Sequence, residues 1–108
     1  MEKRKPHYSL SQLQDMLSDE HTRIITRKCK QEAAEIGYFD DAMIVERVLR
    51  LTRKEFYKSM TAYENSQLWQ DVYKSEDGER SLYIKLQLSV GKNQAVVIQF
   101  KTDTSKEW

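Results

Sequence analysis

The sequence predicts an α+β fold in which a helical N-terminal half packs on a largely antiparallel β-sheet. In the first half of the chain apolar residues recur at the three- to four-residue spacing of helices, whereas from Leu68 onward they alternate with the two-residue period of strands. Helices and strands do not alternate, so the βαβ units of a parallel sheet are not expected. The chain, 108 residues long, suffices for one hydrophobic core and is predicted to form a single domain, residues 1–108.

The first predicted helix begins after Ser9. Ser9 and Gln12 have the spacing of a capping box, in which two side chains satisfy backbone N–H groups that the first turn leaves unpaired. Leucines then recur on one helix face, at Leu10, Leu13 and Leu17. The segment is therefore predicted to be an amphipathic helix whose leucines lie in the core.

Two further helices are expected before residue 52. One begins after Thr26 and stops at Gly37, because glycine readily adopts the positive φ found at helix C-termini. The next begins near Asp40 and Asp41, whose carboxylates are favourable at the positive end of the helix dipole. Its core-facing stripe is Ile44, Val48 and Leu51.

A short fourth helix is predicted from a second capping-box pattern. Thr52 and Glu55 have the required spacing, and the helix would run through Met60 and end before Ala62. Lys58 would then lie near its C-terminus, where a cation is favourable against the helix dipole whether or not it has a function.

The second half of the chain is predicted to form antiparallel strands. The expected strands are residues 68–73, 82–90 and 96–101. A polar loop, residues 75–79, joins the first two, and Gly91 with Asn93 supplies the positive φ of a tight turn between the last two. The core-facing residues of the last strand would be Val96, Ile98 and Phe100. The outer face of the sheet would carry Tyr83, Lys85 and Lys101.

The formal net charge of +1 hides local concentrations of positive charge. Residues 82–102 contain lysines and no acid, and a second basic group lies between Arg47 and Lys58. A solvated helix face explains such groups as well as a binding groove does. The balanced net charge argues against non-specific coating of nucleic acid, which requires many phosphates to be neutralised at once. The charge distribution is still compatible with a local binding groove.

The sequence predicts a soluble, cytoplasmic protein without membrane contact. Cys29 is the one cysteine, so no intramolecular disulfide can form. The N-terminus lacks the apolar core of a signal peptide, and no run approaches the ~20 apolar residues of a membrane helix. The polar tail, residues 102–108, is expected to be mobile, and no role is assigned to Trp108.

The distribution of histidines and acids does not favour metal catalysis, and no metal or other cofactor is expected. His7 and His21 have no neighbours at metal-ligand spacing. His7 is expected to be exposed and inert, and a supporting role near the site is the alternative. Lysine, tyrosine, glutamine and arginine suit RNA cleavage in which a 2′-hydroxyl attacks the adjacent phosphate. Such an enzyme needs a base, positive charge for the transition state and a proton for the leaving oxygen. Many basic surfaces would meet that description.

Four segments of the chain form a distinctive pattern. They are MEKRKPHYSLSQ, EFYKSMTAYENSQLWQDVY, SLYIKL and VVIQFK. Their order and spacing, from Met1 to Lys101, are similar to those of MqsR-type toxins, a branch of the RelE-like mRNA interferases. FYKSMT followed by WQDVY is the most specific part of the match.

The resemblance implies a RelE-like domain and a metal-independent endoribonuclease that cuts single-stranded mRNA at short GC-containing sites, inhibiting translation and growth. It also implies a cognate antitoxin with a zinc-binding half that binds the toxin and a helix-turn-helix half that binds DNA. Operator DNA would be reached only through the toxin–antitoxin complex, which regulates its own operon.

The motifs of the family also indicate site residues. The catalytic residues implied are Lys58, Gln70 and Tyr83. The residues expected to contact the substrate are Tyr57, Lys85 and Lys101. Lys58 is expected to stabilise the phosphate or to transfer a proton, and Tyr83 to donate or relay one. Tyr83 and Lys85 share a strand face, which is equally expected of an exposed cross-strand pair without a catalytic role. Tyr57 would either stack on a base or pack in the core.

Gln70 presents a conflict within its strand. Simple alternation places it on the face of Leu68 and Val72, which would point it away from the site if that face is the core. If Trp69 and Tyr73 face the core instead, or if the strand is bulged, Gln70 points towards the site. Glutamine is not a base at neutral pH, so its expected role is to orient a phosphate or a nucleobase.

Two other functions fit the same residues. A non-catalytic module would use the fold to bind RNA or an antitoxin and regulate transcription. A strictly ribosome-dependent interferase would cut mRNA only during translation. Substitution of Lys58 or Tyr83 tests the first alternative, and an assay without ribosomes tests the second.

Overall fold

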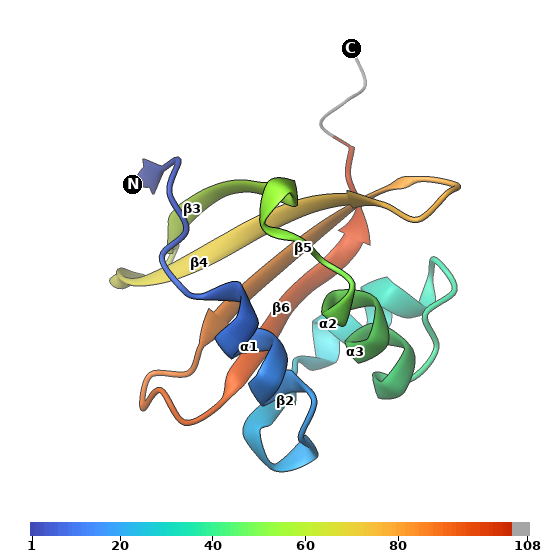
Figure 1. Cartoon of the computed structure of the whole chain (residues 1–108), viewed down its shortest axis with the longest axis horizontal. Helices are drawn as coiled ribbons and strands as arrows, with labels where there is room; N and C mark the ends of the chain where they lie inside the picture. The colour runs from blue at the N-terminus through green and yellow to red at the C-terminus, as the bar shows by residue number, and fades with distance from the viewer. Residues whose placement is uncertain (105–108) are drawn as a thin grey trace.

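The computed structural model describes residues 1–104. Trp108 and most of the tail that is predicted to be mobile lie outside the described residues, so that prediction stays untested. Within residues 1–104 the elements are β1 (Glu2–Lys3), α1 (Leu10–Leu17), η1 (Glu20–Thr22), β2 (Arg23–Ile25), α2 (Arg27–Ala34), α3 (Asp41–Leu49), η2 (Arg53–Glu55), β3 (Phe56–Ala62), β4 (Asn65–Glu76), β5 (Ser81–Leu88) and β6 (Ala95–Thr102), where η marks a single 3₁₀ turn. Figure 1 shows their arrangement.

The six strands within residues 1–104 form one sheet, in the order β1-β3-β4-β5-β6-β2. Neighbouring strands are antiparallel except β2 and β6, which are parallel. In Figure 1 the helices lie together below the long strands β3 and β4. The predicted α+β class, with a helical N-terminal half on a largely antiparallel sheet, is confirmed. No helix in the described part of the chain is long and apolar enough to cross a membrane.

Side-chain caps confirm the three predicted helix starts. Ser9, Thr26 and Asp40 each accept a hydrogen bond from the backbone N–H three residues later, at 3.3, 3.1 and 2.9 Å. These bonds satisfy N–H groups that a helix start leaves unpaired. α2 ends at Ala34, and Gly37 has a φ of 96°. The positive φ of Gly37 therefore belongs to the turn that follows α2 and not to the end of the helix.

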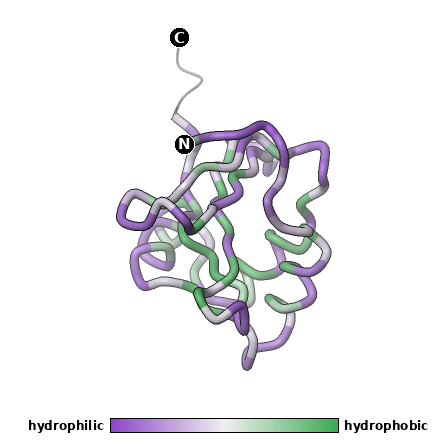
Figure 2. Tube along the Cα trace, turned by 90° about the vertical axis from the view of Figure 1, so that its left-hand side faces the viewer, coloured by the Kyte–Doolittle hydropathy of each residue, from purple (hydrophilic) through white to green (hydrophobic). Residues whose placement is uncertain are grey.

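The helices share one core with the apolar face of the sheet. Its fully buried side chains include Leu13, Leu17, Ile44, Tyr73, Leu82, Ile84 and Phe100. In Figure 2 the hydrophobic segments gather towards the interior, whereas the outer loops are hydrophilic. Burial of each large apolar side chain contributes about 1.5–3 kcal/mol to stability. The predicted leucine stripe of α1 is confirmed.

The predicted fourth helix is wrong. The capping pattern exists, since the Thr52 N–H donates to Glu55 Oε1 at 2.9 Å, but it opens only the single turn η2. The residues that follow form β3, which pairs with β4 on one side and β1 on the other. Phe56 packs edge-on against Tyr73, with ring centres 5.6 Å apart, and Ser59 is fully buried. These tertiary contacts outweigh the local helix signal.

A bulge breaks the alternation predicted for β6. The pairing register shifts between Lys85 and Leu86 of β5, which leaves Ile98 as the extra residue of β6. Val97 therefore belongs to the core cluster, whereas Val96, although buried, lies on the opposite face. The core-facing positions predicted for Val96 and Ile98 are wrong for this reason, whereas that of Phe100 is confirmed.

The sequence pattern predicts neither of the edge strands β1 and β2. They contain two and three residues, too few to show an alternation. Each forms by pairing with a strand far along the chain, β1 with β3 and β2 with β6. Long-range pairing of this kind leaves no local sequence signal.

Candidate active site

The predicted site residues lie on the face of the sheet opposite the core, which we call the open face. Its polar residues include Lys58, Gln70, Lys74, Tyr83, Lys85, Gln87 and Lys101. One cross-strand row runs through Lys58, Val72 and Lys85, and the next through Lys74, Tyr83 and Lys101. Directly opposed residues in such rows are close enough for their side chains to interact. The sheet therefore brings together residues from β3, β4, β5 and β6.

Lys58 lies in the middle of β3, so the helical setting predicted for it is wrong. Its ammonium donates to Glu2 Oε2 at 2.8 Å. The side chain of Lys58 is 18% exposed and that of Glu2 is 52% exposed. This bond raises the pKa of Lys58 and lowers the pKa of Glu2. Lys58 is therefore a positive charge held in place at neutral pH.

Tyr83 lies on β5 between Lys74 of β4 and Lys101 of β6. The Lys101 ammonium is 5.4 Å from the centre of the Tyr83 ring. Burial raises the pKa of Tyr83, and the positive charge of Lys58 opposes this shift only in part. The phenol therefore keeps its proton at neutral pH and can donate it to an anion.

Lys85 is the half-buried cation at the centre of the open face. Burial lowers the pKa of Lys85, and repulsion from Lys101 and Lys58 lowers it further. Glu32 of α2 opposes that shift. The charge of Lys85 is therefore poorly compensated by the protein, and a bound anion such as a phosphate would stabilise it.

Tyr57 is the extra residue of a bulge in β3, since the pairing register shifts between Phe56 and Lys58. The ammonium groups of Lys74 and Lys58 lie 3.7 and 5.5 Å from the centre of its ring, and the guanidinium of Arg4 lies 5.6 Å away. Tyr57 is 36% exposed. The core setting considered for Tyr57 is therefore wrong, and stacking on a base stays a prediction. An exposed ring among cations suits a nucleic-acid base with its backbone phosphate.

The structure resolves the conflict over Gln70. Tyr73 is 1% exposed in the core and Trp69 shares its face, so Gln70 points to the open face. There its Nε2 donates to Gln87 Oε1 at 2.7 Å. Gln87 therefore orients the amide of Gln70 next to the row that contains Lys58.

Several residues at the open face were not predicted from the sequence. They are Glu2, Arg4, Lys74 and Gln87. Lys74 and Gln87 could have been found, because the two-residue period places Lys74 on the face of Gln70 and Gln87 on the face of Tyr83. Glu2 carries no such signal, because it reaches Lys58, 56 residues away, only through the pairing of β1 with β3.

His7 lies on the opposite face of the sheet and helps to anchor the N-terminal segment. Its ring stacks on Trp69 with centres 5.4 Å apart, and its backbone N–H donates to both carboxylate oxygens of Asp71 at 3.0 and 3.1 Å. Asp71 is fully buried and also accepts from Tyr8 N–H at 3.0 Å and Ser59 Oγ at 2.6 Å. Burial lowers the pKa of His7. These bonds hold the segment that carries β1 to the sheet.

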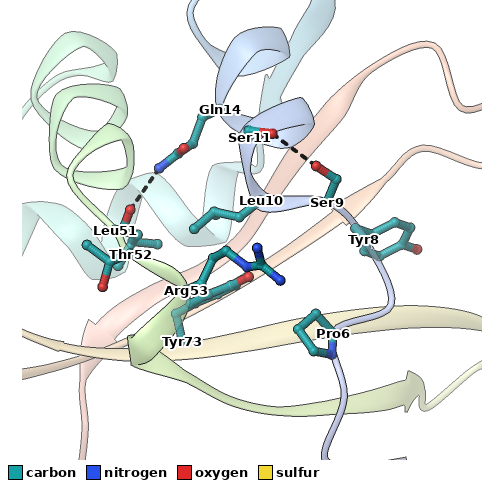
Figure 3. Close-up of a pocket in the computed structure, with 10 residues that line it drawn as sticks. All are labelled: Pro6, Tyr8, Ser9, Leu10, Ser11, Gln14, Leu51, Thr52, Arg53 and Tyr73. Atoms are coloured by element: carbon teal, nitrogen blue, oxygen red, sulfur yellow. Dashed lines mark hydrogen bonds between the residues drawn. The ribbon is translucent and has the colours of Figure 1, made fainter.

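A cavity of about 400 Å³ lies on the helix side of the sheet (Figure 3). Its lining residues are Pro6, Tyr8, Ser9, Leu10, Ser11, Gln14, Leu51, Thr52, Arg53 and Tyr73. Gln14 donates to the Leu51 carbonyl at 3.0 Å across its rim. The lining contains none of the predicted site residues, so this cavity is separate from the open face.

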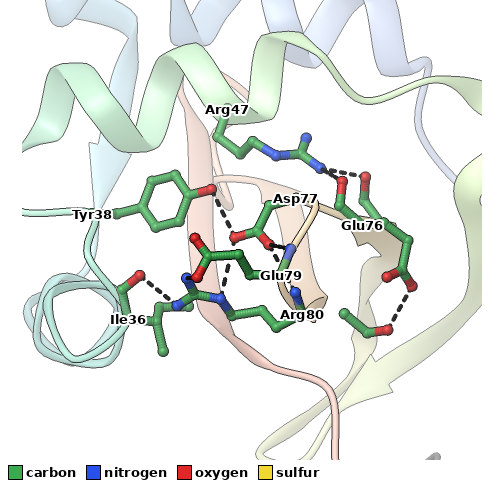
Figure 4. Close-up of polar contacts among 9 residues, drawn as sticks. Ile36, Tyr38, Arg47, Glu76, Asp77, Glu79 and Arg80 are labelled. Carbon is green, nitrogen blue, oxygen red and sulfur yellow. Dashed lines mark hydrogen bonds and ion pairs between the residues drawn. The ribbon is translucent and has the colours of Figure 1, made fainter.

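The loop between β4 and β5 is tied to the helical side of the molecule (Figure 4). Asp77 accepts a hydrogen bond from the Tyr38 hydroxyl at 3.2 Å and pairs with Arg80 at 3.3 Å. Arg80 also donates to the Ile36 carbonyl at 2.7 Å. Contacts with the connection between α2 and α3 therefore determine the position of this loop.

The fold and the open face together define a small α+β protein. The lysines, tyrosines and glutamines of the open face suit the binding of a phosphodiester. Residues 5–102 match the family described as "Motility quorum-sensing regulator, toxin of MqsA", and the chain belongs to this toxin family. A relative, the mRNA interferase toxin MqsR of Escherichia coli (strain K12), is 34% identical over 101 residues, which are 94% of this chain and 98% of the relative. The predicted family and enzyme class, an mRNA interferase toxin, are confirmed. The roles of individual site residues stay predictions.

Proposed function

We propose that the chain cuts single-stranded mRNA, without a metal ion, by attack of a 2′-hydroxyl on the neighbouring phosphate. The observation that carries the proposal is the convergence of Lys58, Tyr83 and Lys101 from three strands on the open face. The substrate carries its own nucleophile, so the protein must supply positive charge and proton transfer, which lysine and tyrosine side chains can do. The name of the Escherichia coli relative supports mRNA as the substrate.

Each predicted site residue has a role in this reaction. The cations that stabilise the transition state are Lys58, Lys85 and Lys101. Tyr83 donates a proton to the leaving 5′-oxygen, because its raised pKa keeps the phenol protonated. Gln70, oriented by Gln87, directs the phosphate or a base, and Tyr57 stacks on a base beside the cut.

The same proposal includes a cytoplasmic toxin–antitoxin pair. The family description, a toxin of MqsA, supports an antitoxin as the partner. We infer an antitoxin with a zinc-binding half that holds the toxin and a helix-turn-helix half that binds operator DNA, so that the complex regulates its own operon. Free toxin then cuts mRNA at short GC-containing sites without a ribosome and arrests growth.

Cleavage of a defined RNA tests the activity. Purified protein is incubated, in EDTA and without ribosomes, with a single-stranded RNA that contains every trinucleotide. We expect cuts at a few GC-containing sites that leave 2′,3′-cyclic phosphate and 5′-hydroxyl ends. Lys58→Ala and Tyr83→Phe should each lower the rate by about 10²–10³-fold, the usual loss of one charge-stabilising or proton-transferring group.

Controls separate the alternatives. Lys92→Ala removes an exposed lysine from the β5–β6 turn and should leave the rate unchanged. A 2′-deoxy nucleotide at the cut should abolish cleavage, because it removes the nucleophile. RNA or antitoxin binding without cleavage by the folded wild type would contradict the proposal and support a regulatory module. Cleavage only with translating ribosomes would support the ribosome-dependent alternative.

A further inference from the structure

The proposed reaction requires a base for the 2′-hydroxyl proton, and neither Lys58 nor Tyr83 supplies one. Lys58 is held protonated by its bond to Glu2, and Tyr83 is protonated and serves as the acid. We propose that Glu2 is the general base of the cleavage, the carboxylate that takes the proton of the attacking 2′-hydroxyl. This inference rests on the nuclease function proposed above.

The position of Glu2 is determined by the sheet. β1 pairs with β3 so that Glu2 lies opposite Met60, and its carboxylate contacts the Lys58 ammonium at 2.8 Å. The Glu2 side chain is 52% exposed, so a substrate can reach it. A phosphate bound at Lys58 therefore lies within reach of Glu2, and the 2′-hydroxyl of the same nucleotide is adjacent to that phosphate.

Other acids of this face are less suited to the task. The Asp103 carboxylate is 1% exposed and pairs with Lys74 at 3.4 Å. Glu76 Oε2 accepts a hydrogen bond from Ser81 Oγ at 2.5 Å, at the end of the sheet beyond Tyr83. Glu2, by contrast, is exposed and touches the predicted catalytic residue Lys58.

The proton and electron balance of the step is complete. The 2′-hydroxyl loses its proton to a Glu2 carboxylate oxygen as the bond from O2′ to phosphorus forms. The bond from phosphorus to O5′ breaks, and the Tyr83 phenol donates its proton to O5′. The products are a 2′,3′-cyclic phosphate and a 5′-hydroxyl, and solvent then returns the proton from Glu2 to Tyr83. Lys58 holds both the carboxylate and the phosphate throughout.

The dependence of the rate on pH distinguishes a carboxylate base from a lysine base. The charged and titratable groups that face Glu2 are Arg4 and the N-terminal amine on its own segment, Lys58 on β3 and Tyr83 on β5. All three cations favour the ionised carboxylate. Glu2 is then ionised and Tyr83 protonated from about pH 5 to about pH 9, so the titration of these two groups should leave the single-turnover rate unchanged over that range.

Glu2→Gln is the central variant, because glutamine keeps the size and a hydrogen-bonding oxygen of the side chain but cannot take the proton. We expect the single-turnover rate at neutral pH to fall by about 10²–10⁴-fold, the usual contribution of a general base. The affinity for an uncleavable RNA with a 2′-deoxy nucleotide at the cut should stay within about threefold of the wild type. The residual rate should rise with pH, because hydroxide replaces the lost base.

Matched variants complete the test. Glu2→Asp should recover part of the rate, whereas Glu64→Gln, an exposed acid in the β3–β4 turn, should match the wild type. Cleavage by Glu2→Gln within about threefold of the wild type would overturn the assignment. So would a wild-type rate that rises about tenfold per pH unit through neutrality, the behaviour of a lysine base. A folded wild type that cuts no RNA would refute the proposed function, and the assignment with it.

Discussion

At the scale of single residues, Lys85 of the open face lowers the stability of the folded protein. Lys85 is half-buried, and burial with the nearby charges of Lys101 and Lys58 lowers its pKa. A lysine with a lower pKa in the folded chain destabilises that state at every pH below the folded pKa. The penalty disappears as the pH rises from the folded to the unfolded pKa, because both states then become neutral. In the function proposed above, a bound phosphate would offset this loss of stability.

Lys85→Met should therefore stabilise the protein while impairing cleavage. We expect the free energy of unfolding, measured by urea denaturation at neutral pH, to rise by about 1 kcal/mol. The gain should shrink in alkaline buffer, where the wild-type lysine loses its proton. Lys92→Met, at an exposed turn position, serves as the control and should change stability by less than about 0.5 kcal/mol. Unchanged or lower stability of Lys85→Met would contradict the account of its environment.

Residue-level prediction from the sequence succeeded where a period or a motif carried the information. The two-residue period alone brings Tyr83 and Lys85 to one face, and the register of β5 with β6 adds Lys101. The position of Gln70 was left open because both faces of its strand carry apolar residues, and only the burial of Tyr73 decides between them. Glu2 could not be predicted, since a two-residue strand has no pattern.

At the scale of elements, local sequence patterns predicted where a segment begins more accurately than which secondary structure it forms. α1, α2 and α3 begin where the sequence predicted, and Ser9, Thr26 and Asp40 cap these starts. The pattern at Thr52 was equally good, yet it opens a single turn, because pairing with β4 and β1 draws the next residues into a strand. The bulges at Tyr57 and Ile98 arise from the pairing register between strands, so no local sequence pattern predicts them.

The N-cap of α3 gives a test at this scale. Asp40 Oδ1 accepts the Met43 N–H at 2.9 Å, so Asp40→Ala should lower the free energy of unfolding by about 1 kcal/mol. Asp40→Asn keeps an accepting oxygen and should cost only a few tenths of that amount. Thermal or urea unfolding compares the two variants. Equal stability of the alanine and asparagine variants would show that the cap contributes nothing to the helix.

At the scale of the whole molecule, charge is distributed unevenly between two faces. The net charge is only +1, yet lysines from four strands share the open face. Two of these lysines, Lys58 and Lys74, pair with Glu2 and Asp103, and the opposite face is covered by helices. Such an arrangement concentrates positive potential where a single RNA strand would lie without making the whole protein a non-specific polyanion binder.

The salt dependence of RNA binding measures this asymmetry. Each phosphate neutralised on a single strand contributes about −0.7 to the slope of log affinity against log salt concentration. If Lys58, Lys74, Lys85 and Lys101 each meet a phosphate, the slope should be about −3 for an uncleavable 2′-deoxy RNA analogue followed by fluorescence anisotropy. Lys101→Ala should reduce its magnitude by about 0.7, whereas Lys92→Ala should leave it unchanged. Equal effects of the two variants would mean that the RNA does not follow the open face, because Lys101 lies on that face and Lys92 does not.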